Sequence, residues 1–400
     1  MPYAWVIVGA CAVMMALAFG AVSNVAVFLT PLAADFGWPR AGVSLAYSVA
    51  TIASGLGGIA MGYFADRLPV RRVLLCGALA PAIALVLLSR MTSTFELYAY
   101  HALMGAVGLG AVMAPANNLA AQWLARRPGL AIGVVAIGAA SGQGLLPYFA
   151  RYLIVTEGWR QAYLTLGVAY GLIMMPLTLL VRDAPRAPAA SFAVAAQGNP
   201  YTLSRPQLLA LLSLAAALCC VCMSTPMMHV VALGSDYGLS ERDAAGLLAV
   251  MAIAGMAGRI AFGRFSDRAG SLRAYMAASL GQTVLAVLFP YATTRAELYL
   301  LSSVFGFIFS GAMVSFIVCA REYAPSGKTG LSIGIVMFFA WLGMALGAWQ
   351  GGLFYDLCGD YFRSFFNASL AGVANLLILA ILFLHTFQPG IAGRFRLYTK

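Results

Sequence analysis

Long apolar stretches separated by short polar segments dominate the sequence. Most of them reach about 20 residues, the length at which an α-helix crosses roughly 30 Å of hydrocarbon. Twelve such spans are present, at residues 4–34, 42–65, 72–90, 96–124, 129–155, 160–181, 206–234, 243–265, 273–292, 297–320, 329–355 and 362–386. The pattern predicts an all-α membrane protein with twelve transmembrane helices. In the fifth span, Gly142, Gly144 and Pro147 predict an interruption of the helix.

Short motifs recur along the chain at one spacing. Gly62–Arg67 (GYFADR) returns 201 residues later as Gly263–Arg268 (GRFSDR), and Gly129–Gly133 (GLAIG) returns as Gly330–Gly334 (GLSIG). A repeated motif in a very apolar chain indicates two homologous halves, as in transporters built from membrane repeats. The expected organisation is a six-helix bundle at 1–181, a cytoplasmic linker at 182–205, a second six-helix bundle at 206–387 and a cytoplasmic tail at 388–400.

Composition and charge agree with a membrane protein. Hydrophobic residues make up 62% of the chain and charged residues 9%, against about 25% charged in soluble domains. Of the 24 lysine and arginine residues, 16 fall on the side of the two termini, seven on the opposite side and one, Arg259, within a span. This bias follows the positive-inside rule and predicts cytoplasmic termini. It also explains the net charge of +11 without a nucleic-acid partner. The expected location is the inner membrane of a bacterial cell.

Arg259 is the charged residue that the predicted helices do not accommodate easily. An arginine at this depth costs at least about 2.5 kcal/mol on insertion scales. Its guanidinium fork fits a carboxylate with two hydrogen bonds, which makes Arg259 a candidate substrate anchor. Two structural alternatives are that it extends towards the cytoplasm or pairs with Asp66 or Asp267. The equivalent position of the first half is Gly58, so the fold itself does not require an arginine there.

The repeated motif resembles the loop signature of the major facilitator superfamily, which lies between helices 2 and 3. The resemblance implies two bundles of six helices, a central cavity and transport by alternating access. It also implies a conformational switch in which the aspartate pairs with an arginine or caps a helix end. The switch residues are Gly62, Asp66, Arg67, Arg71, Gly263, Asp267 and Arg268. Pro69 departs from the family pattern, which often has glycine there.

Other segments resemble one branch of that superfamily, the monocarboxylate transporters and the bacterial oxalate/formate antiporters. Gly258-Arg259 with Gly263 and Ser266-Asp267 is similar to their helix 8, and Asn117–Gly133 is similar to their helix 4–5 region. Phe36-Gly37-Trp38 fits as well. In this branch an arginine at the Arg259 position binds the substrate carboxylate.

The chain departs from that branch at three places. Ser23-Asn24 stands where animal members have a lysine, and Gly255 stands where many have an acid. The helix 11 segment Phe338–Trp341 lacks the second cation of the oxalate exchanger. A single cation matches a single carboxylate, which disfavours oxalate, and the missing acid weakens the case for proton symport.

Several other side chains are candidates for the substrate cavity. Amides donate and accept hydrogen bonds, and aromatic or aliphatic side chains limit the size of a ligand. The candidates are Asn117, Asn118, Asn24, Phe28, Gln143, Leu145, Phe338, Phe339 and Trp341. Helix–helix hydrogen bonding is the alternative for the amides, and core or lipid packing for the aromatic residues. His229 is a candidate for proton coupling, with a structural interfacial histidine as the alternative.

Together these features predict a secondary active transporter of a small organic anion, of the lactate or pyruvate type, that acts by proton coupling. The alternatives are an anion exchanger, an efflux transporter of a drug-like compound and a sensor that transports nothing. An enzyme is disfavoured because the spans hold no His-Glu cluster or paired acids, and no Walker loop for ATP is present. The seven cysteines show no metal-binding spacing. We expect no metal or cofactor, and a monomer in the lipid bilayer whose partners are the substrate carboxylate and protons or a counter-anion.

Overall fold

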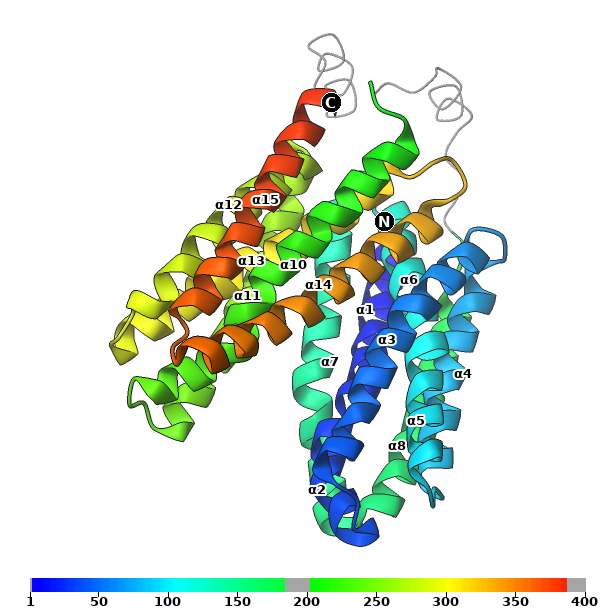
Figure 1. The fold of residues 1–400 in the computed structure, drawn as a ribbon. Coiled ribbons are helices and arrows are strands. Elements are labelled where there is room, and N and C mark those ends of the chain that lie inside the picture. Colours follow the sequence, from blue (N-terminus) through cyan, green and yellow to red (C-terminus); the bar gives the residue numbers. More distant parts are fainter. Residues whose placement is uncertain (1, 184–201, 387–400) are drawn as a thin grey trace. The chain divides into compact units, whose positions relative to one another are not determined.

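The computed structural model describes residues 2–183 and 202–386, which form helices joined by short turns (Figure 1). Twelve helices in these ranges are long and apolar enough to cross a membrane, as predicted. The first half comprises α1 (Pro2–Ser23), α2 (Val25–Phe36), α3 (Arg40–Ala65), α4 (Val70–Leu88), α5 (Thr94–Leu103), the π-helical turn η1 (Met104–Leu109), α6 (Gly110–Trp123), α7 (Pro128–Glu157) and α8 (Trp159–Leu180).

The second half comprises α10 (Arg205–Asp236), α11 (Glu241–Ala269), α12 (Ser271–Leu288), the 3-10 turn η2 (Phe289–Tyr291), α13 (Arg295–Tyr323), α14 (Thr329–Cys358) and α15 (Phe362–Thr386). The predicted tail at 388–400 and most of the predicted linker at 182–205 lie outside the described residues.

The described helices belong to two compact units. One contains α1 to α8 together with the first turns of α14, Lys328–Phe338; the other contains α10 to α13, α15 and the rest of α14. Helix bounds recur between the halves at the spacing of 201 residues found in the sequence. For example, α7 and α14 begin at Pro128 and Thr329, and α4 and α12 begin at Val70 and Ser271. The spacing of 201 residues found in the sequence motifs therefore recurs in the bounds of these helices.

Equivalent capping boxes begin two equivalent helices. In the first half, Ser93 accepts from the Glu96 backbone N–H while the Glu96 carboxylate accepts from the Ser93 N–H. Thr294 and Glu297 repeat the arrangement at the start of α13. Each box satisfies backbone donors that a helix start leaves without an intrahelical partner.

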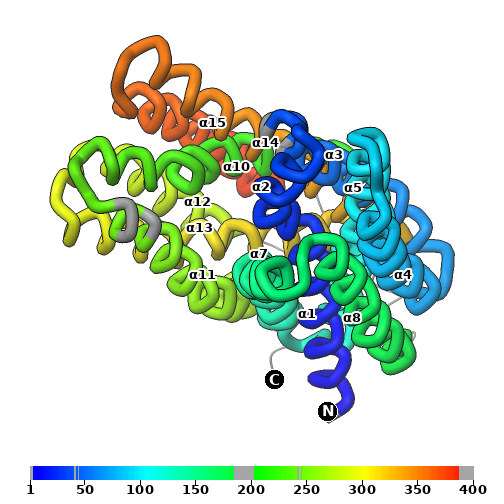
Figure 2. The backbone as a smooth tube through the Cα atoms, turned by 90° about the horizontal axis from the view of Figure 1, so that it is seen from below, coloured from blue at the N-terminus to red at the C-terminus, as the bar shows by residue number. Residues whose placement is uncertain are grey.

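Glycines allow neighbouring helices within each unit to pack at close range. In the first unit, α1 runs beside α7 (Figure 2), and a Cβ atom on Gly138 or Gly142 would collide with the carbonyl of Ala12 or Ala16. In the second unit, α11 and α13 are in similar contact, and a Cβ on Gly258 would collide with the Phe307 carbonyl. Small residues are the usual means of bringing membrane helices together.

The predicted interruption of the fifth span is wrong. Helix α7 is continuous from Pro128 to Glu157 with Pro147 inside it. The first span, predicted as one helix, instead divides at Asn24 into α1 and α2. Membrane helices tolerate proline and glycine because neighbouring groups satisfy the freed backbone atoms, so neither residue type by itself locates a break.

Candidate functional site

Arg259 lies in α11, one residue beyond the close contact of Gly258 with the Phe307 carbonyl of α13. Its side chain is half-buried. Among the residues that the structure describes, none forms a hydrogen bond or ion pair with Arg259. Asp267, the acidic candidate within the same unit, therefore forms no ion pair with Arg259 in this structure. A guanidinium with five donors and no protein acceptor is chemically suited to an anionic ligand.

Gly255 lies one helical turn before Arg259, where many members of the resembling branch carry an acid. A Cβ atom at Gly255 would lie 2.5 Å from the Ser310 hydroxyl and 3.2 Å from the Gly306 carbonyl. Ser310 is fully buried, and its hydroxyl has no hydrogen-bond partner in the described chain. A side chain at position 255 would therefore require the Ser310 hydroxyl to rotate away and the α13 backbone to give slightly.

Asp66 caps the start of α14 within the first unit. Its carboxylate accepts from the Gly330 N–H at 2.8 Å and from the Leu331 N–H at 3.0 Å. Gly62 allows this approach, because a Cβ there would collide with the Gly330 carbonyl. Of the two interactions expected for this aspartate, the structure shows the helix cap. The cap also places the negative charge of Asp66 at the positive N-terminal end of α14.

The remaining switch candidates lie at helix ends. The Arg67 guanidinium stacks 3.9 Å from the Tyr63 ring centre, and Arg71 is exposed in the first turn of α4. In the second copy, Gly263 is buried, Asp267 is half-buried and Arg268 is exposed in the last turn of α11.

Four of the cavity candidates lie at the junction of α1 and α2, on α2 and on α6. Asn24 and Phe28 are fully buried, and the Phe28 ring stacks on Tyr163 of α8 with 3.7 Å between ring centres. Asn117 is buried and donates to the Met113 carbonyl at 2.8 Å, while its own side-chain oxygen has no partner in the described chain. Asn118 is half-buried. Asn24 and Asn117 thus retain unused hydrogen-bonding capacity.

The other candidates lie on α7 and α14. Gln143 and Leu145 are exposed on α7. On α14, Phe339 is exposed, and Phe338 and Trp341 are half-buried. Phe338 packs against α3, where a Cβ on Gly55 would lie 3.0 Å from its ring.

His229 of α10 contacts α14 within the second unit. Its Nε2 atom lies 3.0 Å from the Ala348 carbonyl oxygen. Because a carbonyl only accepts, Nε2 carries the hydrogen in this contact and Nδ1 remains as the acceptor of a neutral ring. Gly351 makes room for the imidazole, and the Tyr361 ring lies 5.3 Å away. His229 therefore has a structural hydrogen bond through Nε2, and this bond does not use its Nδ1 atom.

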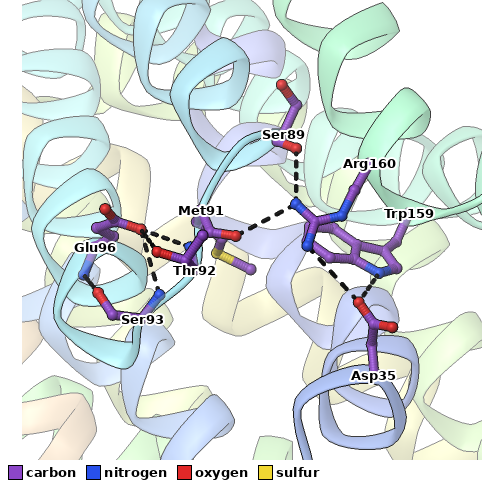
Figure 3. Close-up of polar contacts among 8 residues, drawn as sticks. All are labelled: Asp35, Ser89, Met91, Thr92, Ser93, Glu96, Trp159 and Arg160. Atoms are coloured by element: carbon purple, nitrogen blue, oxygen red, sulfur yellow. Dashed lines mark hydrogen bonds and ion pairs between the residues drawn. The ribbon is translucent and has the colours of Figure 1, made fainter.

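A cluster around Arg160 in the first unit was not anticipated from the sequence (Figure 3). Its guanidinium points at the Ser89 and Met91 carbonyls, both at 3.4 Å, and at the Asp35 carboxylate at 3.9 Å. Trp159 donates to the same carboxylate at 3.2 Å. These contacts join the ends of α2, α4 and α8. The signal in the sequence is an aromatic residue followed by arginine directly after Gly158, a helix boundary.

Comparison with known proteins places the chain in a family. The sequence profile of the Major Facilitator Superfamily matches residues 11–348. Monocarboxylate transporter 13 of Bos taurus is 28% identical over 391 residues, covering 94% of this chain and 89% of its own. The agnestins efflux protein AgnL12 of Paecilomyces divaricatus is 25% identical over 281 residues, covering 70% of this chain and 63% of its own. A crystal structure of FucP, a transporter in the outward conformation, has a TM-score of 0.74 at 14% identity and covers 96% of this chain and 98% of that one.

Proposed function

We propose that this chain, which belongs to the major facilitator superfamily and is a multi-pass membrane protein, is a proton-coupled secondary transporter of small monocarboxylates. The expected substrates are of the lactate and pyruvate type, carried by alternating access. The observation that carries the proposal is Arg259, a half-buried arginine in a membrane helix without a hydrogen bond or ion pair in the described chain. The relatives named as monocarboxylate transporters support the same substrate class.

The physical argument rests on the cost of placing a guanidinium in the bilayer. That cost is at least about 2.5 kcal/mol, and no carboxylate of the described residues pairs with Arg259 to offset it. A substrate carboxylate offsets it when the two groups form paired, charge-assisted hydrogen bonds. Because the chain offers one such cation, the proposed substrate carries one carboxylate.

We assign the other candidates supporting roles in substrate selection. The side-chain amides orient the substrate through hydrogen bonds, and the apolar side chains limit its size. The amides are Asn24, Asn117, Asn118 and Gln143, and the apolar residues are Phe28, Leu145, Phe338, Phe339 and Trp341.

The switch residues are proposed to stabilise one conformation of the transport cycle. In this proposal, the Asp66 cap on α14 breaks and reforms as the transporter changes conformation. Gly62, Arg67 and Arg71 belong to this copy, and Gly263, Asp267 and Arg268 form the second. His229 is the proposed proton carrier, with exchange against a counter-anion as the alternative mode.

The charge bias supports a definite membrane orientation. We propose that both termini face the cytoplasm and that the protein resides in a bacterial inner membrane, since 16 basic residues fall on that side and seven on the other. Thiol reagents that do not cross membranes test the orientation. In a Cys358→Ser variant, which removes the partly exposed cysteine at the far end of α14, exposed Cys76 near the start of α4 is expected to react only after the membrane is opened, and reaction of Cys76 in intact cells contradicts the orientation.

A second candidate function is efflux of a larger organic compound. It is favoured by the similarity to AgnL12, whose name describes an efflux protein. A single arginine as the charged group also suits a large anionic product. Competition assays separate the two functions, because efflux of bulky compounds is not inhibited by lactate or pyruvate.

Uptake into proteoliposomes tests the main proposal. We expect Arg259→Lys to lose at least about tenfold in substrate affinity, because lysine keeps the charge but loses the two-pronged contact, and a hydrogen bond to a charged group contributes about 1.5–3 kcal/mol. Arg264→Lys is the matched control, because Arg264 is exposed on the same helix. Folded Arg259→Ala protein with unchanged affinity for lactate and pyruvate rules out the carboxylate role.

A further inference from the structure

A group of aromatic and basic side chains lies where α1 begins and where α6 and α8 end. The Tyr3 hydroxyl donates to the Leu180 carbonyl at 2.6 Å, and the Trp123 indole donates to the Arg182 carbonyl at 3.0 Å. The Tyr3 and Trp123 rings pack edge to face with 5.3 Å between their centres. Carbonyls at the end of a helix lack partners within it, so these two donors hold the end of α8 against α1 and α6.

The arginines of this group form no ion pair with the residues that the structure describes. The Arg182 guanidinium lies 5.4 Å from the centre of the Tyr3 ring, within the range of a cation–π contact. Arg126 and Arg127 follow Trp123 in the turn between α6 and α7, and both are exposed. Three positive charges thus lie at or next to the two rings, and no described carboxylate is paired with them.

The neighbouring sequence supplies little negative charge. Asp183, which is exposed, is the single acidic residue between Glu157 and Asp236. Residues 184–204 contain no acid and add a further arginine, Arg186. The turn between α6 and α7 contains no acid either. The excess positive charge is therefore balanced by anions from outside the chain.

Exposed apolar side chains lead away from this group along α1 and α8, which lie side by side (Figure 2). On α8, Leu172 and Leu179 are two turns apart on one face and are 71% and 61% exposed. On α1, Trp5 is 49% exposed, and a Cβ atom on Gly9, one turn later, would meet no atom within 4 Å. Both helices therefore offer apolar surface to acyl chains directly beside the basic group.

The second half does not repeat the group. The spacing of 201 residues relates Tyr3, Trp123 and Arg182 to Ser204, Ala324 and Phe383. In the second half Arg205 donates to the Ala324 carbonyl at 2.7 Å, so an arginine makes the contact that an aromatic donor makes in the first half. The duplicated fold thus does not itself require two aromatic donors flanked by arginines at this end.

We propose that Tyr3, Trp123, Arg126, Arg127 and Arg182 bind the headgroup of an anionic phospholipid, in the leaflet on the side of the two termini. Guanidinium groups bind phosphate oxygens through charge-assisted hydrogen bonds. Tyrosine and tryptophan rings are enriched at headgroup depth. The apolar surface of α1 and α8 favours a lipid over a soluble phosphate, and each arginine near the membrane surface favours an anionic over a zwitterionic lipid by about fivefold.

Thermal unfolding in detergent with added lipid tests the proposal, because a ligand of the folded state raises the melting temperature. We expect phosphatidylglycerol to stabilise the wild type at a lower concentration than phosphatidylcholine. Arg126→Gln/Arg127→Gln should raise the required concentration of phosphatidylglycerol by at least about tenfold. Arg182→Gln should raise it about fivefold, although it keeps the backbone carbonyl that Trp123 contacts.

Arg72→Gln/Arg264→Gln is the matched control. It removes the same charge from two exposed arginines that lie elsewhere, at the start of α4 and near the end of α11, and it should leave the effect of phosphatidylglycerol unchanged. The melting temperature of each variant without lipid separates lost binding from lost stability.

Three results overturn the proposal. Equal stabilisation by phosphatidylglycerol and phosphatidylcholine removes the selectivity for an anionic lipid. Equal weakening in the control variant assigns the effect to net charge rather than to this group. Stabilisation by glycerol phosphate alone, at the concentration at which phosphatidylglycerol acts, shows that the arginines bind a soluble anion instead of a lipid.

Discussion

Single glycines determine how closely the helices within a unit approach one another. Gly142 and Gly144 are both in α7, two residues apart, but their surroundings differ. A Cβ on Gly142 would collide with the Ala16 carbonyl of α1, whereas a Cβ on Gly144 would meet no atom within 4 Å. The two positions therefore provide a matched comparison of close packing against helix propensity.

We expect Gly142→Ala to destabilise the protein by about 1–3 kcal/mol, because α1 and α7 must separate to admit the methyl group. Gly144→Ala should be neutral or stabilising by up to about 1 kcal/mol, since alanine favours the helix. Thermal unfolding in detergent measures both. Equal effects of the two substitutions contradict the close contact of α1 with α7.

Individual residues differed in how well the sequence revealed them. Arg259 could be identified from the sequence because placing a charged side chain within a membrane span has a high free-energy cost. The buried hydroxyls of Tyr163 and Tyr170, which have no hydrogen-bond partner in the described chain, could not. A tyrosine in an apolar span is usually interpreted as a packing residue. No local pattern shows whether its hydroxyl has a partner.

At the scale of elements, the Asp66 carboxylate connects the end of α3 to the start of α14. We expect Asp66→Asn to lower the melting temperature by about 2–4 °C. The substitution removes the negative charge from the N-terminus of α14 and turns one acceptor into a donor that faces a backbone N–H. Asp66→Ala, which loses both acceptors, should be at least as destabilising.

Salt provides the control for this cap. The charged component is partly screened at high ionic strength, so the difference between wild type and Asp66→Asn should shrink, while that of Gly142→Ala should not. Equal melting temperatures of wild type and both Asp66 variants contradict a stabilising cap.

The element bounds were largely predictable, and the breaks within spans were not. The twelve spans follow from the length of apolar segments, which the thickness of the bilayer dictates. The division at Asn24 and the continuity of α7 through Pro147 depend instead on neighbouring helices, which satisfy or fail to satisfy the local backbone. Glycine was read as a break in α7, although Gly142 serves close packing there.

At the scale of the whole molecule, many helix bounds recur at the spacing of 201 residues, whereas some polar residues proposed for function do not. Arg259 of the second half corresponds to Gly58 of the first, and His229 corresponds to Phe28. The groups proposed to bind the substrate carboxylate and the proton thus have no polar counterpart at the equivalent position of the other half. The coupling mechanism is therefore tested on Arg259 and His229 themselves.

Position 255 is a glycine, whereas many monocarboxylate transporters have an acid there. The mode of proton coupling is therefore the main functional question for the intact transporter. Position 255 carries no acid, so a coupled proton would travel with the substrate or on another group such as His229. We expect an inward proton gradient of one pH unit to support up to about tenfold accumulation at one proton per substrate. Addition of substrate should also make a weakly buffered exterior more alkaline.

His229→Gln separates the two proton routes. Glutamine can still donate to the Ala348 carbonyl but does not titrate, so a loss of pH dependence with retained binding assigns the proton to His229. An intact pH dependence assigns it to the substrate. His385→Gln is the control, since His385 lies in the last turn of α15. Uptake that ignores the proton gradient and requires an anion preloaded inside the vesicles would show that the chain is an exchanger, with Arg259 binding the outgoing and incoming carboxylates in turn.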